Sequence, residues 1–437
     1  MDAHLAFHFA KNRRLHLAVC GSVAAYRGPD LVRMWSDAGI HVSATLTPAA
    51  TRFIAPLTFE ALGASPVYGA MFGGAGEAGP FEHLEPGQTA HAMVIAPASA
   101  DTIARLACGM ADTMVSCQAL AFRGPLVIAP AMNPAMWANP TTKANMAILR
   151  QRGHIIVEPA CGRTACLEEG QGRLADLRLI YAHGLRALVQ KELAVWEKND
   201  RSPSSASSAA MGPSLVGKKV MVTLGPTQER WDGVRHWTNP STGIMGASLA
   251  MAAWLRGAEV HAICGPNTKA NTWLPEGYGV TRYDVGSARD MLTVAESLWD
   301  TMDIGIFTAA VADFSPVPHG SEKFKKQGQD DGFSIRFVPN PDILATLGNA
   351  KKPHQKVMGF AAETDNLLDS MRGKLERKNA DMIVGNYIGG AHGSTGAGFG
   401  SATNAVHILD RHGKTAEIPQ QSKADVAWSA LSWLLDL

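Results

Sequence analysis

An asparagine close to two prolines follows an apolar run that is typical of a buried strand. In GPLVIAPAMNPAMW, residues 124–137, the run Leu126–Ala129 leads into a Pro-Ala-Met-Asn-Pro segment that contains Asn133. An amide with so little freedom could orient a carboxylate through hydrogen bonds, although an ordinary turn asparagine gives the same pattern. Earlier in the chain, MVIAPASAD at 93–101 also leaves an apolar run through Ala-Pro-Ala. We therefore expect the two loops at one edge of a sheet.

A histidine and a cysteine are further candidates for chemistry. His83 stands between Glu82 and Glu85, and an imidazole beside carboxylates gains basicity and can act as a general base. Cys166 lies in CGRTACLEEGQGR, where a loop thiol could be an acid or a nucleophile. On spacing alone, a surface histidine and an inert cysteine explain the same residues.

Small residues at two points are suited to binding phosphate. Gly21 and Ser22 in CGSVAAY stand at a strand-to-helix junction, where backbone N–H groups of a helix N-terminus bind anions. No GxGxxG follows, so a mononucleotide is favoured over a dinucleotide. In the second half, residues 241–243 precede a helix with Met245 and Leu249 at helical spacing and form a similar anion-ready start. Tight turns without a ligand give the same pattern.

Lysines and one aspartate in the second half could hold a triphosphate and its magnesium. FTAAVADFSPV is expected to end a strand at Asp313, and a basic loop with Lys323, Lys325 and Lys326 follows. Lys374 and Lys378 are four residues apart on one face of a helix; its apolar face is expected to consist of Leu368, Met371 and Leu375. Solvated surface lysines are the simpler interpretation of both groups.

Strand and helix patterns alternate in both halves. After opening strands in LHLAVC and KKVMVTL, strands are expected at His41–Leu46, Ala92–Ala96, Leu126–Ala129, Ile155–Pro159, Glu259–Cys264, Ile304–Thr308, Lys356–Gly359 and Asp381–Val384, with helical patterns between them, for example over 101–120. This alternation predicts an α/β fold with two Rossmann-like or flavodoxin-like, doubly wound, mostly parallel sheets. Ligands of such sheets bind at the carboxyl ends of the strands.

A stretch rich in Ser, Ala and Pro separates the halves. EKNDRSPSSASSAAMGPS, from Glu197 to Ser214, has no apolar periodicity and predicts a flexible linker between domains 1–196 and 215–437.

Bulk composition excludes several classes of protein. The chain has 437 residues, 46% of them hydrophobic, and a net charge of +1, so neither nucleic acid nor a membrane is an expected partner. The basic residues near the N-terminus follow the apolar ones, which is the wrong order for a secretory signal. Six dispersed cysteines predict neither a zinc site nor disulfides and favour the cytoplasm.

The first half resembles the flavin-dependent cysteine decarboxylases of coenzyme A biosynthesis. The resemblance covers nearly all of 14–185 and rests on GSVAAY, His83, APASAD, PAMN, and Ala-Cys followed by Gly-x-Gly-Arg. It implies that His83 is the active-site histidine, that Asn133 binds the substrate carboxylate and that Cys166 is the proton donor. It also implies an FMN site formed by Gly21, Ser22, Val23, Thr47, Ser99, Asp101 and Thr102.

The reaction that this resemblance implies explains the residue types. Loss of CO2 from a cysteine carboxylate would leave an unstabilised carbanion, unless oxidation of the thiol carbon to a thioaldehyde lets sulfur share the charge. The enethiol that forms must then be reduced and protonated, and Cys166 is expected to supply the proton.

The second half resembles the phosphopantothenate–cysteine ligases over about 217–436. The motifs are GPT, N-x-S-[ST]-G-x-M-G, AAVAD, EKxKK, NPDI and GFAAET. In the order decarboxylase, linker, ligase, the chain resembles the bifunctional bacterial enzymes, whose ligases use CTP. Asn239 would steady an acyl-cytidylate and Lys323 would neutralise charge on phosphorus. The implied CTP site consists of Ala309, Ala310, Val311, Asp313, Lys323, Asn340, Pro341, Asp342, Ile343, Phe360, Lys374 and Lys378, with Mg²⁺ on Asp313.

Three positions depart from the ligase pattern. Ile244 stands where lysine is usual, Pro240 where histidine is common and Gly400 where asparagine is expected, which affects ligand affinity and rate more than fold. Trimeric decarboxylases with flavin at subunit contacts and dimeric ligases imply a homo-oligomer, and a dodecamer would satisfy both symmetries.

Other functions fit these motifs less well. A non-catalytic flavoprotein regulator would not need His83, Asn133 and Cys166 together. A flavin prenyltransferase or peptidyl-cysteine decarboxylase fused to another nucleotide-binding domain would not consume CTP with free cysteine. The missing GxGxxG disfavours an NAD-dependent oxidoreductase.

Overall fold

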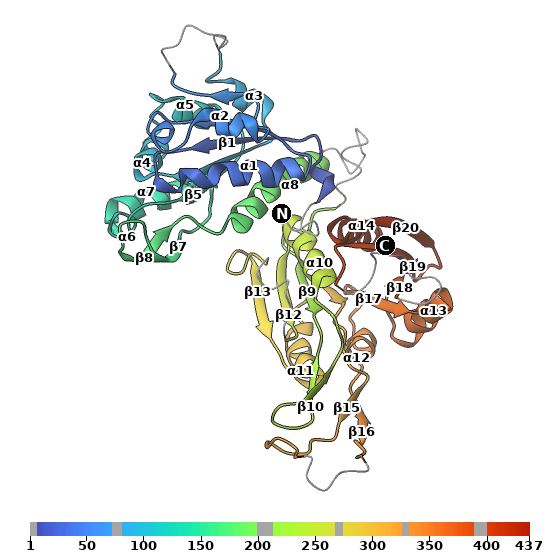
Figure 1. The fold of residues 1–437 in the computed structure, drawn as a ribbon. Helices are drawn as coiled ribbons and strands as arrows, with labels where there is room; N and C mark the ends of the chain where they lie inside the picture. Colours follow the sequence, from blue (N-terminus) through green and yellow to red (C-terminus); the bar gives the residue numbers. More distant parts are fainter. Residues whose placement is uncertain (1–6, 72–80, 199–212, 267–273, 326–331, 389–399) are drawn as a thin grey trace. The chain divides into compact units, whose positions relative to one another are not determined.

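The computed structural model describes all residues except 1–6, 72–80, 199–212, 267–273, 326–331 and 389–399. Contacts divide the chain into two compact units, His8–Met211 and Gly212–Leu437, each with its own large sheet (Figure 1). Helix α8 (Leu177–Lys198) runs two residues into the expected linker, and most of the rest of that linker lies outside the described residues. The boundaries at 196 and 215 therefore stay predictions.

The first unit is built on a six-stranded parallel sheet in the order β3-β2-β1-β4-β5-β6. Nearly all residues of β1, β4 and β5 are buried, as in sheets covered by helices on both faces. The strand order reverses between β1 and β4, which confirms the doubly wound fold. The strands are β1 (Arg14–Val19), β2 (His41–Leu46), β3 (Val67–Tyr68), β4 (Ala92–Ala98), β5 (Leu126–Pro130) and β6 (Ile155–Ile156).

Helices cover both faces of this sheet. On one face Ile95 and Ile128 pack with Ile103 of α4, Val115 of α5 and Leu149 of α7. On the other face α8 contacts β4, β5 and α1. The helices besides α8 are η2 (His8–Ala10), η3 (Val23–Arg27), α1 (Gly28–Asp37), η4 (Ala50–Arg52), α2 (Pro56–Ala61), α3 (Glu85–Thr89), α4 (Ala100–Cys108), α5 (Met114–Ala121), α6 (Pro134–Ala138) and α7 (Pro140–Gln151).

The second unit is built on an eight-stranded sheet in the order β13-β12-β9-β14-β17-β18-β19-β20. The first six strands are parallel, whereas β18, β19 and β20 pair antiparallel, so the fold is mostly parallel as predicted. The strand order reverses between β9 and β14. The strands are β9 (Lys219–Leu224), β12 (Glu259–Cys264), β13 (Val280–Asp284), β14 (Ile304–Phe307), β17 (Lys356–Glu363), β18 (Met382–Tyr387), β19 (Thr403–Asp410) and β20 (Thr415–Ser422).

Two groups of helices cover the second sheet. Helices α11 (Ala288–Trp299), α12 (Ile343–Asn349) and α13 (Leu367–Arg377) contribute to one hydrophobic core, while α10 (Ile244–Leu255) packs on β9, β12 and α14 (Lys423–Asp436). Helix α10 approaches the sheet closely at Gly246, where a Cβ atom would lie 2.5 Å from Cβ of Leu224. The start of α10 is therefore held against the carboxyl end of β9.

Short antiparallel pairs complete both units. In the first unit, β7 (Ala160–Arg163) and β8 (Glu169–Arg173) form a hairpin that contacts α6. In the second, β10 (Gln228–Arg230) pairs with β11 (His236–Thr238), and β15 (Phe314–Pro316) with β16 (Phe337–Pro339). Figure 1 shows these two ribbons extending beyond the end of the large sheet.

The structure corrects four predictions about the elements. The helical pattern over 101–120 is two helices, because Gly109 has a φ of 72° and ends α4. The strand before Asp313 ends earlier, at Phe307, and β6 stops at Ile156. On α13 the buried residues are Leu367 and Met371, whereas Leu368 is 41% exposed.

Within the described ranges, none of the helices combines the length and the apolar character needed to cross a bilayer.

Candidate active sites

The loops that follow β1, β2 and β4 come together at the carboxyl edge of the first sheet. The Thr47 N–H donates to the Val19 carbonyl over 3.0 Å, and the Cys20 N–H donates to the Pro97 carbonyl over 3.1 Å. Two predicted cofactor residues, Thr47 and Ser99, follow β2 and β4 directly, and Gly21 follows β1 after one intervening residue. Because the strand order reverses between β1 and β4, this is the position where doubly wound sheets bind ligands.

Serine hydroxyls cap the two helices that start at this edge. Ser22 Oγ accepts from the Ala24 N–H, and Ser99 Oγ accepts from the Thr102 N–H, each over 3.3 Å. The glycine before Ser22 has a packing reason, since a Cβ atom at Gly21 would lie only 2.4 Å from Cβ of Ala49. Two adjacent capped helix starts concentrate backbone N–H groups, which suits a phosphate.

The other predicted cofactor residues differ in their environments. Thr102 is buried, and its hydroxyl accepts from Ser99 Oγ over 3.2 Å. Asp101 is exposed and pairs with Arg105 over 2.9 Å, so its carboxylate is engaged in a surface ion pair. Val23 is an exposed apolar residue in η3. The structure thus brings Gly21, Ser22, Thr47 and Ser99 to the edge but gives the Asp101 carboxylate another partner.

Asn133 and Cys166, 33 residues apart in the sequence, are in direct contact. Asn133 Nδ2 donates to Cys166 Sγ over 3.2 Å, while Oδ1 accepts from the Ala135 N–H and caps α6. The Thr164 hydroxyl lies 3.0 Å from the same sulfur. Hydrogen bonds from Thr164, Asn133 and the Glu168 backbone hold the pKa of Cys166 below its ordinary value. The exposed thiol is therefore easier to ionise than a free cysteine.

Glycines in β8 make this contact possible. The Met132 N–H donates to the Gly172 carbonyl over 2.9 Å, and a Cβ atom at Gly172 would lie 2.3 Å from the Met132 carbonyl oxygen. Gly170 approaches Pro134 in the same way. The β7–β8 hairpin thus lies against the Asn133 segment with no room for a side chain.

His83 lies in another part of the first unit. It is partly buried and precedes α3 by two residues, and Figure 1 shows α3 and the β7–β8 hairpin on opposite sides of this unit. Within one copy, the structure therefore does not bring His83 to the Asn133–Cys166 pair.

A buried chain of polar side chains supports the segment that carries His83. Gln118 Nε2 donates to the Glu82 carbonyl over 3.3 Å, and Gln118 Oε1 accepts from the Thr45 hydroxyl over 2.7 Å. Behind it, His16 Nε2 is 3.0 Å from Thr45 Oγ1. Burial lowers the pKa of His16 to about 3, so its imidazole is neutral. Because Thr45 donates to Gln118, the proton of His16 belongs on Nε2.

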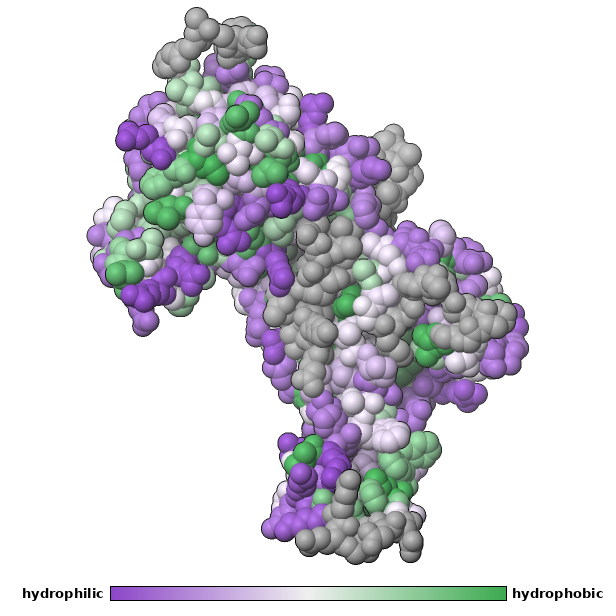
Figure 2. All heavy atoms as spheres, viewed as in Figure 1, coloured by the Kyte–Doolittle hydropathy of each residue, from purple (hydrophilic) through white to green (hydrophobic). Residues whose placement is uncertain are grey.

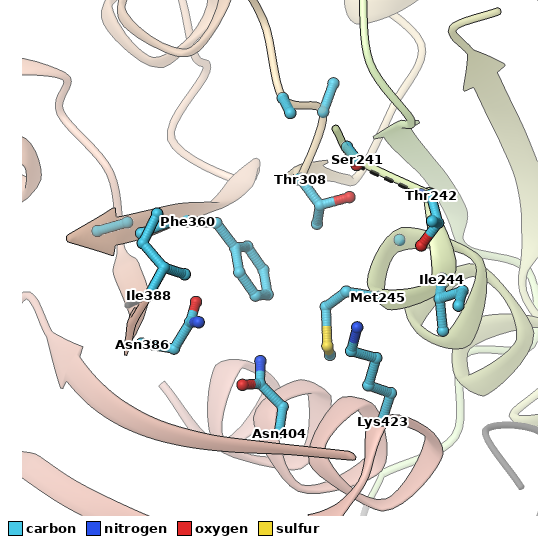
Figure 3. A pocket seen from close by; sticks show the side chains of 16 residues that line it. Ser241, Thr242, Ile244, Met245, Thr308, Phe360, Asn386, Ile388, Asn404 and Lys423 are labelled. Carbon is cyan, nitrogen blue, oxygen red and sulfur yellow. Dashed lines mark hydrogen bonds between the residues drawn. The ribbon is translucent and has the colours of Figure 1, made fainter. Parts of the chain in front are cut away.

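An open pocket lies at the carboxyl edge of the second sheet (Figure 3). It has a volume of about 730 Å³, which includes solvent at its mouth. The described residues that line it are Ser241, Thr242, Gly243, Ile244, Met245 and Gly246, then Thr308, Ala309 and Ala310, then Phe360, Ala361 and Ala362, and finally Asn386, Ile388, Asn404 and Lys423.

Only part of the predicted CTP site lines this pocket. Ala309, Ala310 and Phe360 do, whereas Val311, Asp313, Lys323, Asn340, Pro341, Asp342, Ile343, Lys374 and Lys378 do not. Asn239 Nδ2 donates to the Ala310 and Val311 carbonyls over 3.1 and 3.3 Å. Asn239 therefore shapes the loop after β14 that borders the pocket.

Two of the predicted lysines are paired with carboxylates. Lys374 Nζ is 2.8 Å from Glu363 Oε1, and Lys378 Nζ is 2.9 Å from Asp342 Oδ2. Lys323 is exposed in the segment between β15 and β16. The next residue, Phe324, is anchored because its N–H donates to the buried Asp232 carboxylate over 3.0 Å.

No sequence pattern indicated three pocket residues that carry an amide or amino group. Asn386 is the last residue but one of β18, Asn404 lies in β19 and Lys423 starts α14. Lys423 is only 4% exposed, and burial lowers its pKa to about 8. In the sequence, Ser422-Lys423 gives only a helix-start signal, in which a lysine is normally solvated.

One of the three departures from the ligase pattern falls in this pocket. Ile244 lines it and is buried at the start of α10. Pro240 is exposed, and Gly400 has a φ of 78°, which favours glycine over most residues. Among the residues with described positions, no three His, Cys, Asp or Glu side chains are grouped as they would be for a metal ion. Asp313 as a magnesium ligand stays a prediction.

Comparison with known proteins matches both units. The Flavoprotein family model matches residues 8–185, and the model for the DNA/pantothenate metabolism flavoprotein C-terminal domain matches 215–437. The chain is 39% identical to the coenzyme A biosynthesis bifunctional protein CoaBC of Bacillus subtilis (strain 168) over 423 residues, which cover 96% of each protein. It is 36% identical to that of Vibrio cholerae, over 97% of this chain and 98% of the relative. The Escherichia coli (strain K12) protein is 37% identical, over 92% of this chain and 91% of the relative. The chain therefore belongs to the family of coenzyme A biosynthesis bifunctional proteins.

Proposed function

We propose that this chain makes 4′-phosphopantetheine in two steps, ligation of cysteine to 4′-phosphopantothenate and decarboxylation of the product. The observation that carries the proposal is the end-to-end match to bifunctional relatives, with a separate ligand edge in each of the two matched units. All six cysteines are free, which agrees with work in the cytoplasm.

For the first unit, we propose an FMN site at the edge between β1 and β4. The starts of η3 and α4, capped by Ser22 and Ser99, suit the cofactor phosphate, with Gly21 and Thr47 beside them. Bound FMN would supply the oxidation of the thiol carbon and later return the electrons. The exposed Val23 would cover an apolar part of the cofactor.

The contact between Asn133 and Cys166 supports their proposed roles. Because Asn133 Oδ1 caps α6, the side-chain amide is held in one orientation. Its Nδ2 hydrogens can then donate to the substrate carboxylate or to the thiol. A thiol whose pKa is lowered by Thr164 and Asn133 gives up its proton more readily. Cys166 would therefore protonate the product carbon at the end of the first unit's reaction.

The position of His83 supports a homo-oligomer in which one copy's His83 serves the Asn133–Cys166 pair of another. The two parts lie on opposite sides of a single copy (Figure 1). Apolar side chains are also exposed near the carboxyl edge, including Phe53 and Leu57, which is 69% exposed. Figure 2 shows apolar atoms gathered on the visible face of the first unit, over the region of α2. Such a surface favours contact between copies.

For the second unit, we propose CTP-dependent ligation. The carboxylate oxygen of phosphopantothenate attacks the α-phosphorus and pyrophosphate leaves; the cysteine amine then attacks the acyl carbon and CMP leaves. Lys323 would neutralise charge on phosphorus, with Mg²⁺ held by CTP and Asp313. Asn239, which fixes the Ala310 loop, would steady the acyl-cytidylate.

Mass spectrometry of one reaction tests both steps. The intact chain is incubated with 4′-phosphopantothenate, cysteine, CTP and magnesium, and we expect 4′-phosphopantetheine, CO2 and CMP from a yellow, FMN-containing protein. If the protein converts added phosphopantothenoylcysteine but does not form it from 4′-phosphopantothenate and cysteine, the decarboxylase proposal stands and the ligase proposal is overturned. Consumption of ATP in place of CTP would correct the nucleotide only.

A further inference from the structure

The pocket of the second unit contains a buried lysine with no assigned role. Lys423 is the first residue of α14, and 4% of it is exposed. Figure 3 shows its Nζ directed into the pocket, beside Met245 at the start of α10. Lysines that are merely solvated keep their ammonium group in water, so this placement has a reason in the pocket.

Burial raises the free-energy cost of charging this lysine. Removal from water lowers the pKa of Lys423 to about 8, below that of an exposed lysine. Lys423 is the single charged side chain among the described lining residues, which include no carboxylate. An anionic ligand would favour the charged form of Lys423 and offset the cost of its burial.

Asn404 gives an independent sign of a ligand. It is also 4% exposed, it lines the pocket, and its Oδ1 accepts no hydrogen bond from any residue that the structure describes. Figure 3 shows the Asn404 amide in the pocket near Lys423. A buried amide without a partner is destabilising, and a polar ligand in the pocket would remove that cost.

The start of α10 opens into the same space. Its N-cap residue, Gly243, has a φ of 72° and offers no side chain to cap the helix. The Gly243 N–H donates to Ser241 Oγ over 3.3 Å. Because α10 has 12 residues, its N-terminus carries a partial positive charge that adds to that of Lys423.

We propose that Lys423, with Asn404 and the start of α10, forms a phosphate-binding subsite of the ligase unit. The subsite rests on the proposed ligase function and takes a phosphate group of either substrate, the nucleotide or the phosphopantothenate. Lys374 and Lys378 are held by Glu363 and Asp342, so Lys423 adds a positive charge at the pocket that those two lysines do not supply.

Calorimetric titration of the full chain distinguishes the two sources. CTP and 4′-phosphopantothenate are titrated separately into the wild-type protein and into Lys423→Met, together with cytidine and pantothenate, which lack the phosphate. We expect roughly 10- to 100-fold weaker binding of one phosphate ligand and unchanged binding of its phosphate-free analogue. The ligand that weakens identifies which phosphate the subsite takes.

Two further variants complete the test. Lys414→Met removes an exposed lysine at the β19–β20 turn and should bind all ligands normally. Asn404→Ala should weaken the same ligand by a smaller factor, and it decides the proposal if Lys423→Met does not fold. Binding of both phosphate ligands within twofold of wild type by Lys423→Met and by Asn404→Ala would overturn the subsite.

A different experimental result would show that the proposed ligase function, rather than the phosphate subsite, is wrong. If the wild-type chain binds neither substrate, the ligase proposal fails. Inorganic tripolyphosphate then decides the subsite: binding that Lys423→Met loses supports it, and equal binding by both proteins overturns it.

Discussion

The lowered pKa of the Cys166 thiol comes from hydrogen bonds with its immediate neighbours rather than from a charged partner. The Thr164 hydroxyl and the Asn133 amide lie 3.0 and 3.2 Å from Sγ, and both stabilise a thiolate more than a thiol. A lone cysteine carries no such signal in a sequence. The geometry that distinguishes Cys166 arises only where the hairpin meets the segment after β5.

Replacement of these neighbours should make Cys166 less reactive. In Asn133→Leu and Thr164→Val, the thiolate loses a hydrogen bond, so the pKa of Cys166 rises toward its ordinary value. Since the thiolate is the nucleophile, alkylation by iodoacetamide at pH 7 should slow roughly three- to tenfold, and the midpoint of its pH profile should move upward. The rate is followed by peptide mass spectrometry, with the exposed Cys108 of the same chain as the internal control. Equal slowing at both cysteines would contradict this account.

A second residue-scale prediction concerns Lys323. Its side chain is exposed, so Lys323→Gln should leave the unfolding temperature unchanged. Ligase turnover should fall on the order of a hundredfold, as for other lost charge contacts to a transition state. CMP release measures this, and Lys325→Gln, two residues away and also exposed, is the matched control. Near-normal turnover in Lys323→Gln would remove Lys323 from the mechanism.

At the scale of elements, glycines in β8 decide where Cys166 lies. A methyl group at Gly172 would meet the Met132 carbonyl oxygen, so Gly172→Ala should push the hairpin away from Asn133. Decarboxylation should then fall at least tenfold, on the scale of a 1 Å misplacement, while the ligase of the same chain keeps its rate. Gly69→Ala, where nothing lies within 4 Å, is the control. Parallel loss of both activities would indicate general misfolding instead.

Central strands could be predicted from the sequence because their burial on both faces produces continuous apolar runs. Strands β2 and β12 have the expected bounds, and β4, β5 and β14 differ by one or two residues. The β19–β20 pair escaped prediction because β20 has no continuous apolar run: exposed and partly buried positions alternate over its first five residues, and within the strand only Ser422 is buried. The positions of the pocket residues Asn404 and Lys423 depend on the pairing of β19 with β20, so no local sequence pattern indicated them. Motifs indicated His83, Asn133 and Cys166. No pattern in the sequence indicated that His83 lies apart from the other two within one copy.

At the scale of the whole molecule, the proposed role of His83 leads us to expect that copies share an active site. His83 precedes α3, whereas Cys166 lies in the hairpin on the other side of the unit. A closed ring of identical copies would place the same two surfaces against each other at every contact. Each contact would then hold one complete set of His83, Asn133 and Cys166.

Two inactive variants should therefore restore activity to each other. His83→Asn and Cys166→Ser chains are each expected to lack decarboxylase activity. When they are co-expressed in equal amounts, about one contact in four combines an intact His83 with an intact Cys166, so about a quarter of wild-type decarboxylation should return. The rate is measured on phosphopantothenoylcysteine and normalised to the ligase rate of the same mixture, which neither substitution touches. A mixture as inactive as its components would mean that one copy forms the whole site, and that His83 must reach Cys166 within a single chain.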